Sequence, residues 1–284
     1  MPSLIDIRRR IRSVKNTQQI TKALKMISAA KLRKAQDRAI AARPYANILQ
    51  QMLANVAQAA AQDADDNTLL AVRPENRILI IVVTADMGKA GGFNANLIRM
   101  AQRFVDEHRS NQVSFQLVGK KGRDYFRKRG GTIYGEYIDI FRVVRFETAE
   151  KIADTVIDLF AKSEIDAVYL FGNEFKTVMS SHLSAKRLLP IEVPKTTETV
   201  DYIYEQPPAE LLGTLLPRYI KLQVYSALLE SVAAEHAARM TAMDAASSNA
   251  TDVIDKLTLY MNRVRQASIT REIIEIVSGA AALD

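Results

Sequence analysis

The chain has 284 residues, of which 48% are hydrophobic and 25% charged, a balance typical of a globular protein with one large or two modest domains. It contains no cysteine, which excludes disulfides, thiolate metal ligands and a cysteine nucleophile. It has no apolar run of membrane-spanning length and no secretory signal pattern, so an intracellular protein is expected.

The net charge of +7 is concentrated near the N-terminus. Residues 1–43 hold 12 Lys and Arg against two acids, whereas the remaining chain holds 27 against 30. The basic first segment could lie on nucleic acid or on anionic lipid. The slightly negative net charge of the rest of the chain argues against a nucleic-acid-binding coiled coil. Charged side chains that surround a pair of packed helices are the favoured interpretation.

Residues 3 to about 62 are predicted to form one very long helix. Ser3 and Asp6 suit a start that resembles a capping box, with the acid in place of the usual Glu. Pro44 is expected to kink or break this helix, because proline lacks an amide donor and clashes with the preceding turn.

The middle of the chain, from about 73 to 208, alternates short apolar runs with helical patterns. Strands are expected at 77–86, 114–120 and 166–175, and helices at 94–108 and 148–162. Strands that alternate with helices indicate a mostly parallel sheet covered by helices.

A second long helix is predicted over residues 214–278, which contain no glycine and have Pro217 as a first-turn residue. Two long terminal helices most simply pair as an antiparallel coiled coil, because neither can bury its apolar stripe alone. The residues expected to form this seam are Ile20, Leu24, Ile27, Ile254, Leu257, Met261 and Val264.

The predicted fold class is therefore α/β, with a long antiparallel coiled coil and a Rossmann-like domain. Residues 1–66 and 211–284 are expected to form a discontinuous shaft, and residues 67–210 an α/β foot domain.

No catalytic constellation is evident. The three histidines, His108, His182 and His236, are scattered and show no metal-ligand spacing. The stretch "TADMGKAGGFNANL" places glycines between a strand and a helix, where an anion could bind. Its spacing matches neither dinucleotide nor P-loop motifs, so a tight turn is favoured. A nucleotide- or metabolite-binding α/β domain with a coiled-coil dimerisation arm is the alternative function.

A second basic stretch, "GKKGRDYFRKRGG" (119–131), carries Tyr125 and Phe126. It could contact RNA or phosphate, and a solvated helix with two core aromatic residues is an equally good interpretation.

The ends of the chain resemble a known family. "IRSVKNTQQITKALKMISAAKLRKAQ" (11–36) and "LTLYMNRVRQASITREIIEIVSGAAAL" (257–283) are similar to the two terminal signatures of the gamma subunits of F-type ATP synthases. "TADMGKAGGFN" and "EHAARMTAMDAASSNA" are similar to internal motifs of that family, in the same order. The family's middle motif usually reads D-[RK]-G-L-C-G-G, so Lys89 and Ala90 replace its Leu-Cys pair, and Met261 replaces a Tyr.

The resemblance implies a rotary subunit of a bacterial enzyme, with no catalytic site, cofactor or metal of its own. The terminal helices would form the shaft inside a ring of alpha and beta subunits, with "EIVSGAAAL" (275–283) as its apolar tip. The foot would lie near the epsilon subunit and the c-subunit ring, on the cytoplasmic face of the inner membrane. Direct membrane insertion and nucleic-acid binding are not expected.

The resemblance also implies roles for particular residues. Polar side chains below the tip, together with the basic first helix, would contact the beta subunits and their acidic levers. The expected coupling contacts are Arg265, Gln266, Thr270, Glu272, Lys22 and Lys25, and the expected foot-domain turn comprises Asp86, Gly88, Gly91 and Gly92.

Overall fold

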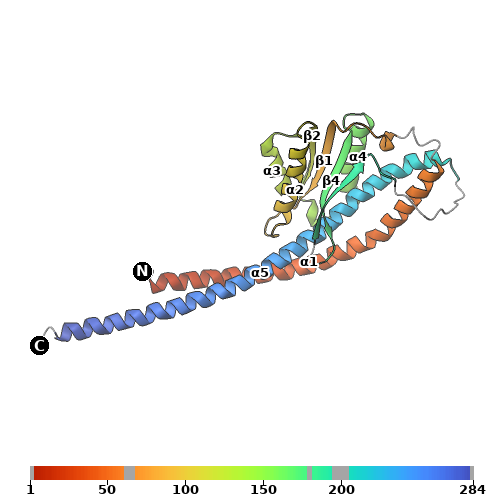
Figure 1. Ribbon diagram of the computed structural model, residues 1–284. Helices are drawn as coiled ribbons and strands as arrows, with labels where there is room; N and C mark the ends of the chain where they lie inside the picture. Colours follow the sequence, from red (N-terminus) through yellow and green to blue (C-terminus); the bar gives the residue numbers. More distant parts are fainter. Residues whose placement is uncertain (1–2, 61–67, 178–180, 194–204, 282–284) are drawn as a thin grey trace. The chain divides into compact units, whose positions relative to one another are not determined.

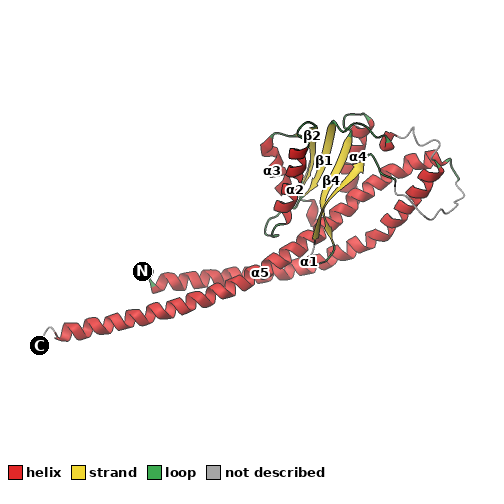
Figure 2. Cartoon of the chain, in the orientation of Figure 1, coloured by secondary structure: helices red, strands yellow, loops and turns green. Residues whose placement is uncertain are grey.

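The computed structural model describes residues 3–60, 68–177, 181–193 and 205–281. The chain divides into two compact units. Met1–Ser28 and Met240–Asp284 form the first, called here the helical unit, and Ala29–Arg239 form the second, called the sheet unit. Each long helix contributes one part to each unit (Figures 1 and 2).

The first helix, α1 (Leu4–Ala59), continues through Pro44 without a break. Pro44 and the preceding-turn residue Ile40 are both exposed, so water can satisfy the carbonyl that loses its intrahelical partner. The expected cap is present: Asp6 N donates to Ser3 Oγ over 3.2 Å, and Ser3 Oγ donates to Asp6 Oδ2 over 2.8 Å. This hydrogen bond lowers the pKa of Asp6.

The last helix, α5 (Pro208–Ala281), begins earlier than predicted. Pro208 takes the first-turn position that was predicted for Pro217, and Pro217 lies inside the helix. Gly213 also lies inside it, so a single glycine did not end the helical segment.

The sheet unit contains five strands in the order β3-β2-β1-β4-β5. The first four are parallel, and β5 is antiparallel to β4. Their bounds are β1 (Arg77–Val83), β2 (Gln112–Val118), β3 (Thr132–Tyr137), β4 (Ala167–Phe175) and β5 (Ser181–Leu189). The mostly parallel sheet predicted from the sequence is confirmed.

The two edge strands were not predicted. In β3, exposed and half-buried residues alternate along the strand, and β5 carries Lys186 and Arg187. Edge strands are often short and charged, which prevents pairing with other chains and also removes the apolar signal on which strand prediction depends.

Helices cover both faces of the sheet (Figure 1). One face packs against α2 (Phe93–Glu107) and α3 (Lys120–Phe126), with a core of Ile78, Ile80, Val82, Leu97, Ala101, Phe115, Leu117, Phe126 and Phe171. On the other face, Gln116 Nε2 donates to Ile152 O of α4 (Phe146–Ala161) over 3.2 Å. Tyr125 and Phe126, the two aromatic residues of the 119–131 stretch, lie in α3, where Phe126 is buried and Tyr125 is half-buried.

The unit boundaries differ from the predicted domain boundaries. Parts of α1 and α5 that were expected in the shaft pack within the sheet unit. Asn173 N of β4 donates to Ser231 Oγ of α5, and Lys221 Nζ of α5 forms ion pairs with Glu150 and Asp154 of α4 at 2.7 and 3.0 Å. Burial of α5 between Leu212 and Arg239 fixes this part of the helix to the sheet.

Candidate functional site: the paired helices and the free end of α5

One face of α1 is buried within the helical unit. Ile7, Thr21 and Ser28 are only 2%, 8% and 2% exposed. The buried and half-buried positions recur at spacings of three or four residues, as in a coiled-coil seam. They are Ile7, Ile11, Val14, Gln18, Thr21, Leu24 and Ser28.

Two predicted seam residues of α1 lie elsewhere. Ile20 and Ile27 are 57% and 52% exposed, whereas Leu24 is half-buried. The apolar side chains of α1 predicted a seam through Ile20 and Ile27, but the spacing that begins at Ile7 places the polar Thr21 and Ser28 in the seam. Small hydroxyl side chains here allow the helices to approach closely.

The four predicted seam residues of α5 lie along one stripe of the helix. They are half-buried and continue this stripe from three buried residues upstream. The complete stripe is Met243, Ser247, Ala250, Ile254, Leu257, Met261, Val264 and Ser268.

Polar contacts set the register of this antiparallel pair. Gln18 Nε2 donates to Thr251 Oγ1 over 2.7 Å. The hydroxyls of Thr21 and Ser247 lie 2.7 Å apart and are buried. Lys25 Nζ lies 2.5 Å from Asp244 Oδ1. Each step toward the N-terminus of α1 is matched by an equal step toward the C-terminus of α5, so Leu4 lies opposite residues 264 and 265.

The C-terminal end of α5 therefore has no partner in α1. Its branched apolar residues are strongly exposed: Ile269 49%, Ile273 56%, Ile274 58%, Ile276 71% and Val277 61%. Figure 1 shows the end of α5 extending past the N-terminus of α1 within this unit. The side chains of the predicted tip after Ser278 lie outside the described residues.

Four predicted coupling residues, Arg265, Gln266, Thr270 and Glu272, lie at the start of this free end, and all are exposed. Thr270 Oγ1 donates to Gln266 O over 2.9 Å, and Glu272 Oε1 accepts from Ser268 Oγ over 3.2 Å. Within the described residues, the side chains of Arg265 and Gln266 make no hydrogen bond or ion pair.

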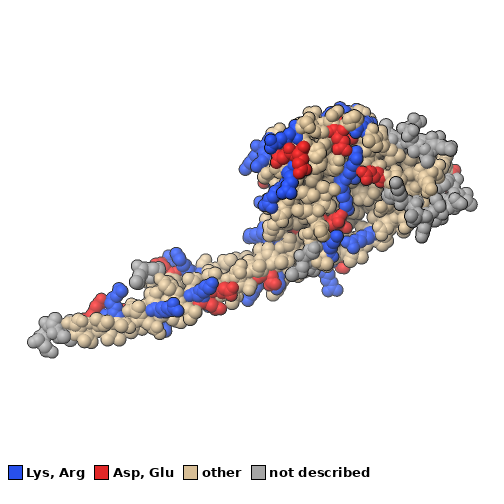
Figure 3. All heavy atoms as spheres, in the orientation of Figure 1, with Lys and Arg blue, Asp and Glu red and all other residues tan. Residues whose placement is uncertain are grey.

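The two predicted lysines differ in their surroundings. Lys22 is exposed, whereas Lys25 is held by Asp244. On the face drawn in Figure 3, acidic side chains lie among the basic ones along the two long helices. The concentrated charge of the first segment is therefore partly balanced by α5.

The glycine turn after β1 is closed by contacts within the sheet unit. Asp86 Oδ1 accepts from Lys120 N over 3.1 Å, and Gly88 O accepts from Arg239 Nη2 over 3.3 Å. Gly91 has a φ of 54°, in the left-handed region that favours glycine. At Gly92, a Cβ would lie 2.8 Å from Asn96 Nδ2. These contacts fit the tight turn that the spacing favoured.

The described residues include no group of three or more His, Asp or Glu side chains placed to hold a metal ion. In the same part of the chain, no helix is both long and apolar enough to cross a bilayer. His236 is buried beside Arg239 and Glu235, which form an ion pair. Burial, together with the positive charges of Arg239 and Lys31, lowers the pKa of His236 to about 4.

One unit is an antiparallel helix pair with a free apolar end, and the other is built on a mostly parallel sheet. This combination is typical of a protein whose long helices act as a shaft. A family model described as ATP synthase matches residues 3–283. The ATP synthase gamma chains of Solibacter usitatus and Pelotomaculum thermopropionicum are 62% and 48% identical, each over 100% of both chains. The chain belongs to the ATP synthase gamma-chain family, whose members are central-stalk rotor subunits without a catalytic site of their own.

Solved structures show the same fold. A chain from the central stalk and c-ring of the Tetrahymena thermophila mitochondrial ATP synthase is 26% identical, with a TM-score of 0.62 over 80% of this chain and 99% of that chain. A chain of the Euglena gracilis mitochondrial enzyme is 18% identical, with a TM-score of 0.67 over 99% of this chain and 94% of that chain. The second likeness concerns the fold alone.

Proposed function

We propose that this chain is the rotating shaft that couples proton flow through a c-subunit ring to ATP synthesis and hydrolysis in the beta subunits. The free end of α5 carries the proposal. Its exposed isoleucines have no partner within the described residues, and burying such a side chain contributes roughly 1.5–3 kcal/mol. A helix end of this kind favours enclosure by another protein, and a ring of alpha and beta subunits would enclose it on all sides.

The polar residues at the start of this end are the proposed handles for the beta subunits. Arg265 and Gln266 are free to donate hydrogen bonds to a partner. Thr270 already donates its hydroxyl hydrogen, so its oxygen is left to accept. Contacts of this directional kind depend on orientation, and a rotor needs contacts that differ between its angular positions. The coupling between rotation and nucleotide affinity is reciprocal, so ATP hydrolysis must be able to drive rotation in the opposite direction.

The basic residues of α1 are proposed to face acidic levers of the beta subunits. Lys22 is available for such a contact. To contact a beta subunit, Lys25 would have to weaken or break its ion pair with Asp244. The cost of this is low, because exposed ion pairs contribute only about 0–1 kcal/mol to stability.

Residues 1–66 and 211–284 are proposed to act as the shaft, and residues 67–210 as a foot that contacts the epsilon subunit and the c ring. The likeness to the Tetrahymena central-stalk chain supports the c-ring contact. The assembly would lie on the cytoplasmic face of a bacterial inner membrane, as expected for a relative of bacterial gamma chains.

Gln266→Ala and Thr270→Ala test the handles in the assembled enzyme. We expect both variants to assemble and to lower proton-driven ATP synthesis several-fold, because a directional contact is lost while the apolar end is retained. Asn249→Ala is the matched control, since Asn249 is an exposed amide on the same helix within the paired region. Unchanged synthesis in both variants would overturn these roles.

A further inference from the structure

The sheet unit contains a cavity lined by basic side chains. It has a volume of about 210 Å³ and lies between α1, α5 and the segment around η4 (Ile140–Arg142). Four basic residues line it, and no acidic residue does. The lining cations are Lys31, Lys34, Arg38 and Arg142.

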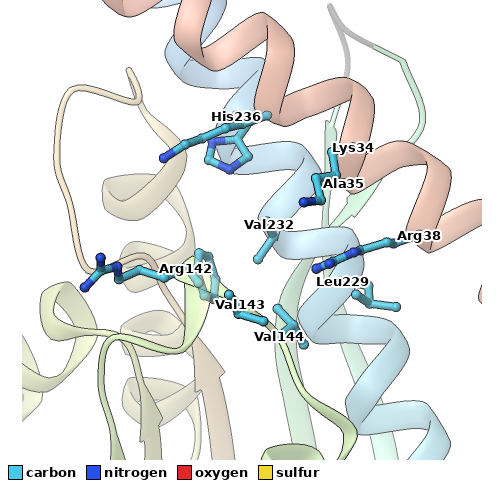
Figure 4. A pocket seen from close by; sticks show the side chains of 11 residues that line it. Lys34, Ala35, Arg38, Arg142, Val143, Val144, Leu229, Val232 and His236 are labelled. Carbon is cyan, nitrogen blue, oxygen red and sulfur yellow. The ribbon is translucent and has the colours of Figure 1, made fainter.

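These cations are not neutralised within the described chain. All four are exposed, and none lies within ion-pair distance of a described carboxylate. Glu235 lies near Lys31, but its carboxylate pairs with Arg239. Three of the cations stand at i, i+3 and i+7 on α1, so they share one face of the helix. Figure 4 shows Lys34 and Arg38 reaching from α1 toward Leu229 and Val232 of α5.

The walls beneath these cations are apolar. They comprise Ala35, Phe141, Val143, Val144, Leu229 and Val232. Val143 is 53% exposed. A ligand that suits this site therefore has an apolar or aromatic body and negative charges at one end.

His236 adds a polar atom to this cavity. The residue is 7% exposed and lines the cavity from α5 (Figure 4). Its Nδ1 atom lies 3.3 Å from Glu235 Oε2 and 3.5 Å from Arg239 Nη1, and its Nε2 atom makes no hydrogen bond within the described residues. A neutral imidazole edge on an apolar wall suits a heterocycle that carries its own donors and acceptors.

We propose that this cavity binds a nucleoside diphosphate, with the base against the apolar wall and His236, and the phosphates on Lys34, Arg38 and their basic neighbours. The volume is below the range of about 300–1,000 Å³ typical of sites that enclose a drug-sized ligand. The base would therefore occupy the cavity, and the phosphates would lie at its rim, where the long basic side chains end.

Calorimetry on the full-length chain with ADP tests the proposal. We expect saturable binding of one ADP per chain, with adenosine and pyrophosphate each binding more weakly, because each presents only half of the recognised chemistry. Arg38→Gln should weaken ADP binding by about tenfold or more, as expected when a charged hydrogen-bond donor is lost. The matched control is Arg33→Gln, which removes an exposed charge from the same helix outside the cavity and should change binding less than twofold.

Three results would overturn the proposal: no saturable ADP binding, an equal loss in Arg33→Gln and Arg38→Gln, or pyrophosphate binding as tightly as ADP. The second would show general attraction of anions, and the third would show that the apolar wall is not used. Thermal unfolding without ligand checks that each variant is folded. Val143→Asp provides an independent test, because this exposed wall position can accept a charge that would oppose both the apolar base and the negative charge of the ligand; unchanged binding in that variant would also contradict the proposal.

Discussion

At the residue scale, the backbone of the glycine turn shows how sequence and conformation can conflict. Lys89 has a φ of 63° although it is not glycine. A side chain in the left-handed region costs roughly 1 kcal/mol relative to glycine. Lys89, one of the residues that depart from the usual family motif, therefore has a strained backbone conformation.

Replacing Lys89 with glycine should stabilise the chain by about 0.5–1 kcal/mol, because the strain is relieved. Lys89→Ala is the control, since it removes the same charge but keeps a Cβ atom. Denaturant unfolding measures both. An equal gain in the two variants would show that the charge, not the backbone, is responsible.

His236 gives the stability a pH dependence. Its pKa is about 4 in the folded chain, against an ordinary value of 6.5. Between these values the unfolded chain binds more protons than the folded chain, so the free energy of unfolding falls as the pH is lowered through this window. We expect a loss on the order of 2 kcal/mol between pH 6.5 and 4.

His236→Gln should remove this part of the acid sensitivity, whereas His182→Gln, at an exposed site, should retain it. Urea unfolding at several pH values gives the free energy of unfolding of the wild type and both variants. Other titrating groups contribute equally to the pH dependence of all three proteins, so the difference between them isolates His236. Parallel pH profiles for the wild type and His236→Gln would contradict the assignment.

At the scale of the elements, the seam follows heptad spacing more closely than it follows hydrophobicity. The α5 half could be predicted because Ile254, Leu257, Met261 and Val264 are apolar and regularly spaced. The α1 half could not, since Thr21 and Ser28 are buried while Ile20 and Ile27 are exposed. A single helix sequence does not reveal that its partner offers Ser247 opposite Thr21.

Ile7→Ala and Ile20→Ala should separate these two faces of α1. Ile7 is 2% exposed, so its truncation should cost about 2–4 kcal/mol, whereas Ile20→Ala should change stability by less than about 0.5 kcal/mol. Thermal unfolding of the isolated chain measures both changes, and similar losses would contradict the assigned seam.

At the scale of the whole molecule, the long helices and the parallel strands were predictable because their patterns persist over many residues. The edge strands and the unit boundaries were not, because they depend on contacts between distant segments, such as those of Ser231 with β4 and Lys221 with α4. The coupling residues came from the family resemblance. The structure adds that Arg265, Gln266, Thr270 and Glu272 share the free end of α5.

The rotation of this chain inside its complex is the most direct test of the account. Because the sequence has no cysteine, Ser110→Cys creates one exposed attachment point for a bead. With the complex fixed to glass through its beta subunits, we predict ATP-driven rotation of the bead in one direction and in regular steps. A bead that stays fixed while the same complexes hydrolyse ATP would contradict the rotor function.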